Sequence, residues 1–232
     1  MFDLIAFDAD DTLWHNEPLY SEAEEKLAEL LSDYAANDIV AQRLFETEMG
    51  NLEYYGYGIK SFTLSMIETA IKLSNGKIQG SEIKKIIGLA HNMLANKPQL
   101  LEHVDKTVST LAQSHPLMII TKGDLLDQEV KLSRANIGDH FQHVEIVSHK
   151  TPATYADLLA RHKIEPQCFL MVGNSLKSDV LPVVELGGHA VYIPYHVTWA
   201  HEIVEDHPGD HDGYYELEHI GQLPALIARL SQ

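Results

Sequence analysis

The chain has 232 residues, of which 45% are apolar and 22% are charged, so it can bury a substantial core and is not expected to be disordered. Lys and Arg total 17 against 34 Asp and Glu, giving a net charge of -17. A surface of this sign repels nucleic acid, but a phosphorylated small molecule stays possible, because its binding depends on local groups and a bound cation.

The first residues, Met1 to Trp14, do not have the pattern of a secretory signal. No basic segment precedes the apolar stretch, and no small-residue cleavage pattern follows it. No apolar run approaches the length of a membrane span, so a membrane is not an expected partner. Cys168 is the single cysteine, which excludes an internal disulfide and favours a buried thiol in a cytoplasmic protein.

A buried strand is predicted from Leu4 to Phe7, and three carboxylates follow it within four residues: Asp8, Asp10 and Asp11. Carboxylates this close disfavour joint ionisation, so a bound cation or a raised pKa on one of them is expected. Oxygen ligands of this kind favour Mg2+. The alternative is an ordinary acidic loop after a strand.

About a hundred residues separate the first strand from the second, which is more than a crossover helix needs. Four segments of this insertion have the apolar spacing of helices: Glu22 to Tyr34, Ile39 to Met49, Phe62 to Leu73 and Glu82 to Leu94. Ser21 and Ser81 are their expected N-caps. We therefore predict a helical cap domain at residues 16–99 and an α/β core at 1–15 and 100–232, with Val104 to Ser114 as the first core helix.

Within the insertion, the segment from Asn51 to Lys60 is rich in aromatic residues and glycine. It is either a loop that faces the substrate or a packed turn between cap helices. We favour the packed turn.

The rest of the chain alternates short apolar runs with amphipathic segments of helical length. The further predicted strands are Leu117 to Ile120, Val144 to Val147, Phe169 to Val172 and Ala190 to Ile193, and the helices between them include Leu125 to Ala135 and Thr154 to His162. This alternation predicts an α/β fold with a doubly wound parallel sheet. We interpret His207 to Asp212 as an exposed turn, not a zinc site, before a strand-like segment from Tyr214 to Leu217.

Polar residues follow three of these later strands. Thr121 and Lys122 end the second strand, Lys150 follows the third, and Asn174 and Asp179 follow the fourth. Ligands of such sheets bind at the carboxyl ends of the strands, and helix N-termini there favour anions. We therefore expect four strand ends, including the one that carries the three aspartates, to form one site.

These residues resemble the four motifs of the haloacid dehalogenase superfamily, in the same order along the chain. Asp8 to Thr12 is similar to the first motif, Thr121 to the second, Lys150 to the third and Gly173 to Asp179 to the fourth. The resemblance runs from Phe2 to Pro194. It implies a Rossmann-like core with a helical cap inserted between the first and second motifs.

The resemblance also implies a Mg2+-dependent phosphatase that acts on a small phosphate ester. Asp8 would be the nucleophile that forms an aspartyl-phosphate, and Asp10 would act first as the acid and then as the base. Thr121 and Lys150 would complete the catalytic set by stabilising the phosphoryl charge. Phosphate would be bound by Thr121, Lys122, Lys150, Asp11 and Thr12. Mg2+ would be bound by Asp8, the backbone carbonyl of Asp10, Asn174 and Asp179, directly or through water.

Two positions depart from the usual pattern of the superfamily. Asn174 stands where phosphatases usually have aspartate, and Lys122 stands where asparagine is common. The same superfamily includes phosphomutases and dehalogenases, and Asp10 argues against a dehalogenase because a leaving halide needs no proton. A binding protein that keeps the fold without catalysis is the remaining alternative, and Asn174 motivates it.

Overall fold

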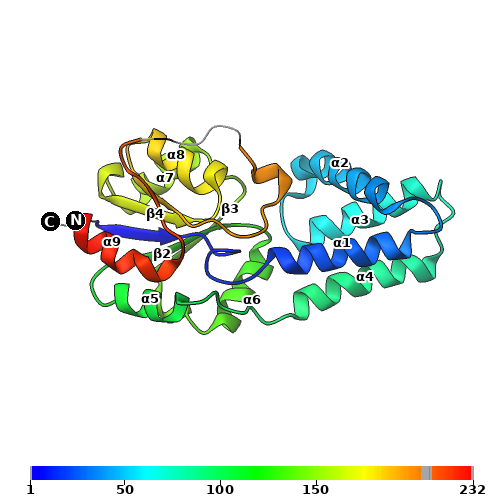
Figure 1. Cartoon of the computed structure of the whole chain (residues 1–232), viewed down its shortest axis with the longest axis horizontal. Coiled ribbons are helices and arrows are strands. Elements are labelled where there is room, and N and C mark those ends of the chain that lie inside the picture. Colours follow the sequence, from blue (N-terminus) through cyan, green and yellow to red (C-terminus); the bar gives the residue numbers. More distant parts are fainter. Residues whose placement is uncertain (1, 205–208, 210, 231–232) are drawn as a thin grey trace. The chain divides into compact units, whose positions relative to one another are not determined.

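The computed structural model describes residues 2–204, 209 and 211–230 (Figure 1). The chain divides into two compact units. One comprises Met1–Glu17, Pro98–Lys122 and Val130–Gln232, and the other comprises Pro18–Lys97 and Gly123–Glu129. The second unit thus contains most of the insertion predicted at 16–99, together with residues 123–129, which the sequence places in the core. That the insertion acts as a cap stays a proposal.

The first unit is built on a six-stranded sheet with the order β3-β2-β1-β4-β5-β6. Every pair of neighbouring strands is parallel, so the predicted α/β fold with a parallel sheet is confirmed. The strands are β1 Leu4–Phe7, β2 Leu117–Lys122, β3 His143–Val147, β4 Phe169–Gly173, β5 His189–Tyr192 and β6 Tyr214–Glu216. Helices cover both faces of the sheet, as the doubly wound arrangement requires.

Alternate side chains of each strand enter different apolar cores, because successive residues of a strand point to opposite faces. In β1, Ile5 and Phe7 pack in the core that contains α5 and α9, whereas Leu4 and Ala6 pack in the core that contains α7 and α8. The helices of this unit, with α6 shared between the two units, are α5 Val104–Leu111, α6 Leu125–Ala135, α7 Pro152–His162, α8 Leu181–Glu185 and α9 Leu223–Leu230. The short helical turns are η1 Gly138–His140, η2 Pro166–Cys168, η3 Leu176–Val180, η4 Ala200–Glu202 and η5 Ile220–Gln222.

The second unit has an apolar core of its own, formed by four helices. These are α1 Glu17–Leu30, α2 Asn37–Tyr55, α3 Ile59–Leu73 and α4 Gly80–Ala95. Both predicted N-caps are wrong, because Ser21 and Ser81 lie inside helices. The first helix begins earlier, with Pro18 in its first turn, where a missing N–H costs nothing. The fourth begins after Gln79, whose side chain forms a capping box with Glu82.

In the segment from Asn51 to Lys60, a short, half-buried turn at residues 56–58 joins two helices, and the residues on either side of it are helical. The α2 helix continues to Tyr55, and Gly56 and Gly58, both with positive φ, lead into α3. Tyr54 and Tyr55 are exposed. Glycine is needed in this connection because residues with a side chain rarely adopt a positive φ.

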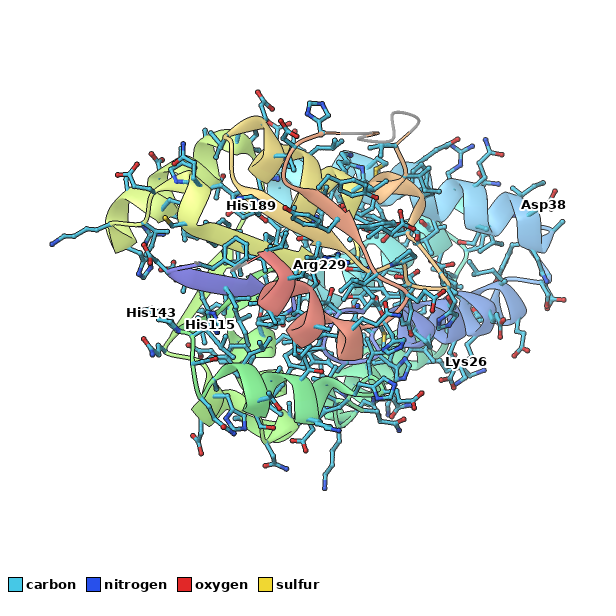
Figure 2. All side chains as sticks on the ribbon, turned by 60° about the vertical axis from the view of Figure 1, so that its left-hand side comes forward. Lys26, Asp38, His115, His143, His189 and Arg229 are labelled. Carbon is cyan, nitrogen blue, oxygen red and sulfur yellow. The ribbon has the colours of Figure 1, made fainter. Side chains whose placement is uncertain are left out.

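Charged side chains project from the surface of the second unit, for example Lys26 of α1 and Asp38 of α2 (Figure 2). None of the helices in the described ranges has the length and apolar character needed to cross a membrane. Of the predicted turn from His207 to Asp212, residues 207, 208 and 210 lie outside the described residues. Cys168 is half-buried in η2 rather than fully buried.

Candidate functional site

The site begins at the carboxyl end of β1, a central strand of the sheet. Phe7, the last residue of β1, pairs with Ile119 of β2 and Val172 of β4. The next residue, Asp8, donates its N–H to the carbonyl of Val172 at 2.8 Å. The sheet therefore holds Asp8 between the ends of β2 and β4, the strands on either side of β1.

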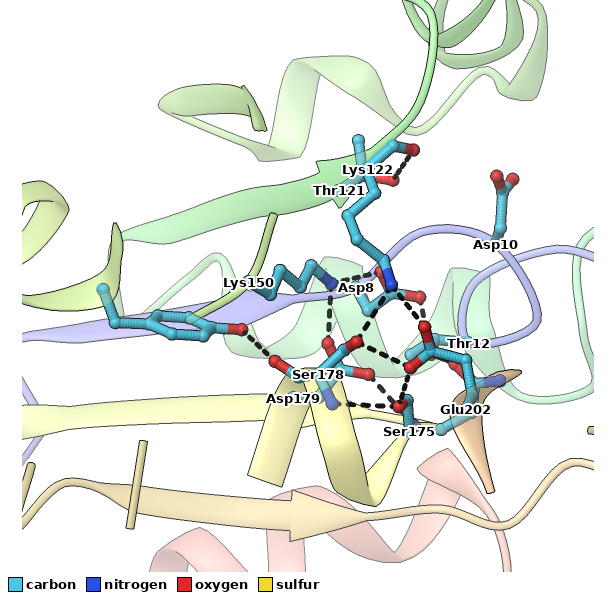
Figure 3. A network of polar contacts seen from close by, with 12 residues as sticks. Asp8, Asp10, Thr12, Thr121, Lys122, Lys150, Ser175, Ser178, Asp179 and Glu202 are labelled. Carbon is cyan, nitrogen blue, oxygen red and sulfur yellow. Dashed lines mark hydrogen bonds and ion pairs between the residues drawn. The ribbon is translucent and has the colours of Figure 1, made fainter. Parts of the chain in front are cut away.

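A buried lysine joins two of the expected carboxylates (Figure 3). Lys150 Nζ lies 2.5 Å from Asp8 Oδ1 and 2.6 Å from Asp179 Oδ1. The side chains of Lys150 and Asp179 are each only 1% exposed, and that of Asp8 is 10% exposed. One ammonium group thus bridges two carboxylates that follow two different strands, which agrees with the predicted convergence of the strand ends.

Burial and charge act in opposite directions on this group. Burial raises the pKa of Asp8 to about 7, against the opposing effect of Lys150 and with a further contribution from Asp179. Burial alone would lower the pKa of Lys150, but the charges of Asp179 and Asp8 outweigh it and raise that pKa. Lys150 therefore stays protonated, whereas burial disfavours the charged form of Asp8.

The loop after β4 forms a tightly hydrogen-bonded turn. Ser175 Oγ accepts the N–H of Ser178 and so caps the single π-helical turn η3, a form often found at functional sites. The N–H of Ser175 in turn donates to Asp179 Oδ2 at 3.0 Å. These bonds fix the Asp179 carboxylate toward Lys150.

Gly173 allows this close approach, since a Cβ atom there would lie 2.2 Å from Asp179 Oδ2. We expect Gly173→Ala to displace Asp179, lowering the free energy of unfolding by about 1–3 kcal/mol and reducing activity. Urea unfolding measures the effect. The control is Gly50→Ala in α2, where a Cβ meets nothing within 4 Å; in that helix the change should be neutral or stabilising. Equal stabilities of the two variants would contradict the prediction.

Thr12, in the same loop as Asp8, connects that loop to the one after β4. Its hydroxyl lies 3.2 Å from Asp8 Oδ2 and 3.1 Å from Asn174 Oδ1. A hydroxyl has one proton, so it satisfies one of these oxygens at a time. Two acceptor oxygens from separate loops therefore face the same small region.

The Asp10 side chain has partners that the sequence did not reveal. Its carboxylate accepts from Trp14 Nε1 at 2.7 Å and from Lys131 Nζ at 3.0 and 3.2 Å, and Lys131 also donates to Asn16 Oδ1 at 2.8 Å. In Figure 3, the Asp10 carboxylate lies apart from the contacts centred on Lys150. No local pattern of the sequence indicated Lys131, because it lies 121 residues from Asp10.

The structure gives Asp11 a different role from the predicted phosphate binding. Its carboxylate accepts the N–H groups of Asn16 at 2.9 Å and of Glu17 at 3.1 Å, at the start of α1. Its own N–H donates to the carbonyl of Trp14. Burial raises the pKa of Asp11 to about 6, although these N–H groups oppose the shift. Asp11 therefore shapes the loop rather than offering a group to phosphate.

At the end of β2, Lys122 does not have the contacts expected of a phosphate ligand. Thr121 is buried, and its hydroxyl donates to the carbonyl of Lys122 at 3.3 Å. Lys122 Nζ lies 2.9 Å from Ser178 Oγ and 2.5 Å from Glu202 Oε1. The predicted phosphate ligand Lys122 is thus paired with an internal carboxylate that the sequence did not identify.

The oxygen atoms around Asp8 fit a magnesium ion with few protein ligands. Within the described residues, no three His, Cys, Asp or Glu side chains form a candidate metal cluster. Both oxygens of Asp179 accept hydrogen bonds from protein groups, whereas Asp8 Oδ2 and Asn174 Oδ1 share one hydroxyl. Mg2+ commonly takes one or two protein ligands and completes its shell with water and phosphate oxygens. Asp8 and Asn174 are therefore the side chains that could hold it.

A family model of haloacid dehalogenase-like hydrolases matches residues 2–187. A haloacid dehalogenase-like family hydrolase from Xanthomonas campestris is 36% identical over 99% of this chain and 91% of its own, with a TM-score of 0.88. Among curated proteins, none matches the chain.

Two more distant structures share the fold. A 2-haloacid dehalogenase from Pseudomonas syringae pv. Tomato DC3000 is 21% identical, with a TM-score of 0.65, over 99% of this chain and 100% of its own. A predicted phosphoglycolate phosphatase from Haemophilus somnus 129pt is 19% identical, with a TM-score of 0.61, over 100% of this chain and 98% of its own. At these identities they show the fold alone, and they include both reaction types.

Proposed function

Because the chain belongs to the haloacid dehalogenase-like hydrolase family, we propose that it hydrolyses small phosphate monoesters with Mg2+, through an aspartyl-phosphate on Asp8. The observation that carries the proposal is the buried contact of Asp8 with Lys150, with a second carboxylate, Asp10, two residues away. A displaced halide needs no proton, whereas an alkoxide does, so a carboxyl group at position 10 favours phosphate chemistry. A cytoplasmic location is part of the same proposal.

In this proposal the reaction has two displacements at phosphorus. A carboxylate oxygen of Asp8 forms a bond to phosphorus while the bond from phosphorus to the ester oxygen breaks. Water then attacks the phosphorus, the acyl-phosphate bond breaks, and the Asp8 carboxylate and inorganic phosphate are released. Splitting the reaction in this way replaces one difficult displacement by two easier ones.

Lys150 supplies a fixed positive charge to both displacements. Its contact with Asp8 Oδ1 holds the nucleophile in one orientation, and Asp179 holds the lysine in turn. Because these groups are buried, their charges act in a medium of low dielectric and need no reorganisation during the reaction. Mg2+, held by Asp8 and Asn174, would add positive charge that offsets the phosphoryl oxygens.

Asp10 would move the protons. As an acid it would protonate the leaving ester oxygen, and as a base it would take a proton from the attacking water. Its carboxylate accepts hydrogen bonds from Trp14 and Lys131 in this structure, so it must turn from them to reach the ester oxygen.

We expect Asp10→Asn to lower kcat for an alkyl phosphate by about 100-fold. The loss should be smaller for p-nitrophenyl phosphate, whose leaving group needs no proton. Steady-state kinetics with both esters measure the difference. Asp139→Asn, in η1 of the same unit, is the matched control. Equal losses with both esters would show that Asp10 does not act as the acid in the first displacement.

The proposed function is tested by phosphate release from a panel of phosphate monoesters, with and without added Mg2+. We expect turnover that EDTA abolishes and Mg2+ restores, and a beryllium fluoride adduct on Asp8. Halide release from 2-haloacids is measured in parallel. Halide release without phosphate release would show that the protein is a dehalogenase. The absence of both activities would favour a non-catalytic binding protein.

A further inference from the structure

Glu202, in η4, joins two segments that are distant from it in the sequence. Its Oε1 lies 2.5 Å from Lys122 Nζ at the end of β2. Its Oε2 accepts from Ser175 Oγ at 2.5 Å and from Ser178 Oγ at 2.6 Å, both in the loop after β4. Lys122 also donates to Ser178, so the four side chains form a closed set of hydrogen bonds (Figure 3).

This carboxylate is shielded from solvent and fully charged. The side chain of Glu202 is 11% exposed and that of Lys122 is 16% exposed. Burial opposes ionisation, but Lys122 and the two serine hydroxyls lower the pKa of Glu202 to about 2. A hydrogen-bonded ion pair of this kind holds its two side chains in place. Separating them is costly, because each charge would then be buried without a partner.

The contacts of Glu202 continue to the proposed nucleophile. Ser175, which donates to Glu202, also donates its N–H to Asp179 Oδ2. The other oxygen of Asp179 accepts from Lys150, and Lys150 donates to Asp8. Each of these four contacts is 3.0 Å or shorter and joins buried or largely buried groups.

We propose that Glu202 is a positioning residue: it binds Lys122 to the loop after β4 and so holds Asp179 and Lys150 in register with Asp8. This inference rests on the proposed function, because the register matters for catalysis only if Asp8 is the nucleophile. It also assigns Lys122 a role in place of the phosphate binding predicted from the sequence. Supporting residues of this kind hold the reacting groups to within about 0.5 Å of the geometry that the reaction needs.

The kinetic test uses Glu202→Gln, which keeps the shape of the side chain and removes its charge. We expect kcat for p-nitrophenyl phosphate to fall by about 10-fold, with KM changed by less than about 3-fold, because the geometry of the reaction is altered and substrate contacts are not. Glu185→Gln, exposed at the end of α8, is the matched control and should leave both constants unchanged. Ser178→Ala, a milder change, should lower kcat less.

A double-mutant cycle tests whether Glu202 acts through Lys122. If the two residues form one unit, Lys122→Met combined with Glu202→Gln should lower kcat no more than the worse single variant. The same cycle is followed by urea unfolding, where the shifts of the midpoint should also be non-additive. A purely structural pair would show coupling in unfolding but leave kcat of the soluble, folded variants unchanged.

The outcomes separate the inference from the proposed function. Wild-type protein without phosphatase activity would overturn the proposed function, and the unfolding cycle alone would then decide whether Glu202 and Lys122 act as one unit. With an active wild type, an unchanged kcat in Glu202→Gln would overturn the inference. A lower KM with unchanged kcat would also overturn it, because Glu202 would then compete with substrate for Lys122.

Discussion

Replacing Asp8 by asparagine is expected to lower kcat for phosphate ester hydrolysis by about 1,000-fold or more, because an amide oxygen is a poor nucleophile. The fold should be preserved. Lys150 keeps Asp179 as an ion-pair partner, so no buried cation is left without a carboxylate. Since burial raises the pKa of Asp8 to about 7, its charge is held at a cost, and the variant should be at least as stable as the wild type.

The measurement combines single-turnover kinetics with thermal unfolding of the same preparation. Asp157→Asn, on the exposed face of α7, is the matched control and should leave kcat unchanged. The Asp8 variant should also fail to form the beryllium fluoride adduct. More than about a tenth of wild-type activity in Asp8→Asn would show that another residue is the nucleophile.

The second large effect is expected for Lys150→Met. This change leaves the carboxylates of Asp8 and Asp179 buried near each other without a cation. Removing one partner of a buried ion pair costs about 3–5 kcal/mol of stability, so urea unfolding should show a loss of this size. Activity should fall as well, because the fixed positive charge at the nucleophile is gone.

Two comparisons make this prediction specific. Lys106→Met, at an exposed position of α5, should change the free energy of unfolding by less than about 0.5 kcal/mol. Adding Asp8→Asn to Lys150→Met should recover part of the lost stability, since one of the two unpaired charges is removed. A Lys150→Met variant as stable as the wild type would show that the buried contact contributes little to folding.

The parallel sheet and the placement of the proposed nucleophile were readable from the sequence. Continuous apolar runs predict strands that are buried on both faces. Two such runs form β1 and β4 in the structure. Residues that follow neighbouring parallel strands must emerge at the same edge of the sheet. This rule alone predicts that Asp8, Lys150 and Asp179 lie together, as they do.

The pairing of individual side chains was decided only by the tertiary structure. Lys131 with Asp10 and Glu202 with Lys122 are separated by 121 and 80 residues, and no local pattern indicates such partners. Asp11 looked like a ligand because it follows β1, but its positive φ turns the chain so that its carboxylate meets the start of α1. Sequence periodicity determines which residues reach the sheet edge, whereas the paths of the loops determine which of their charges meet.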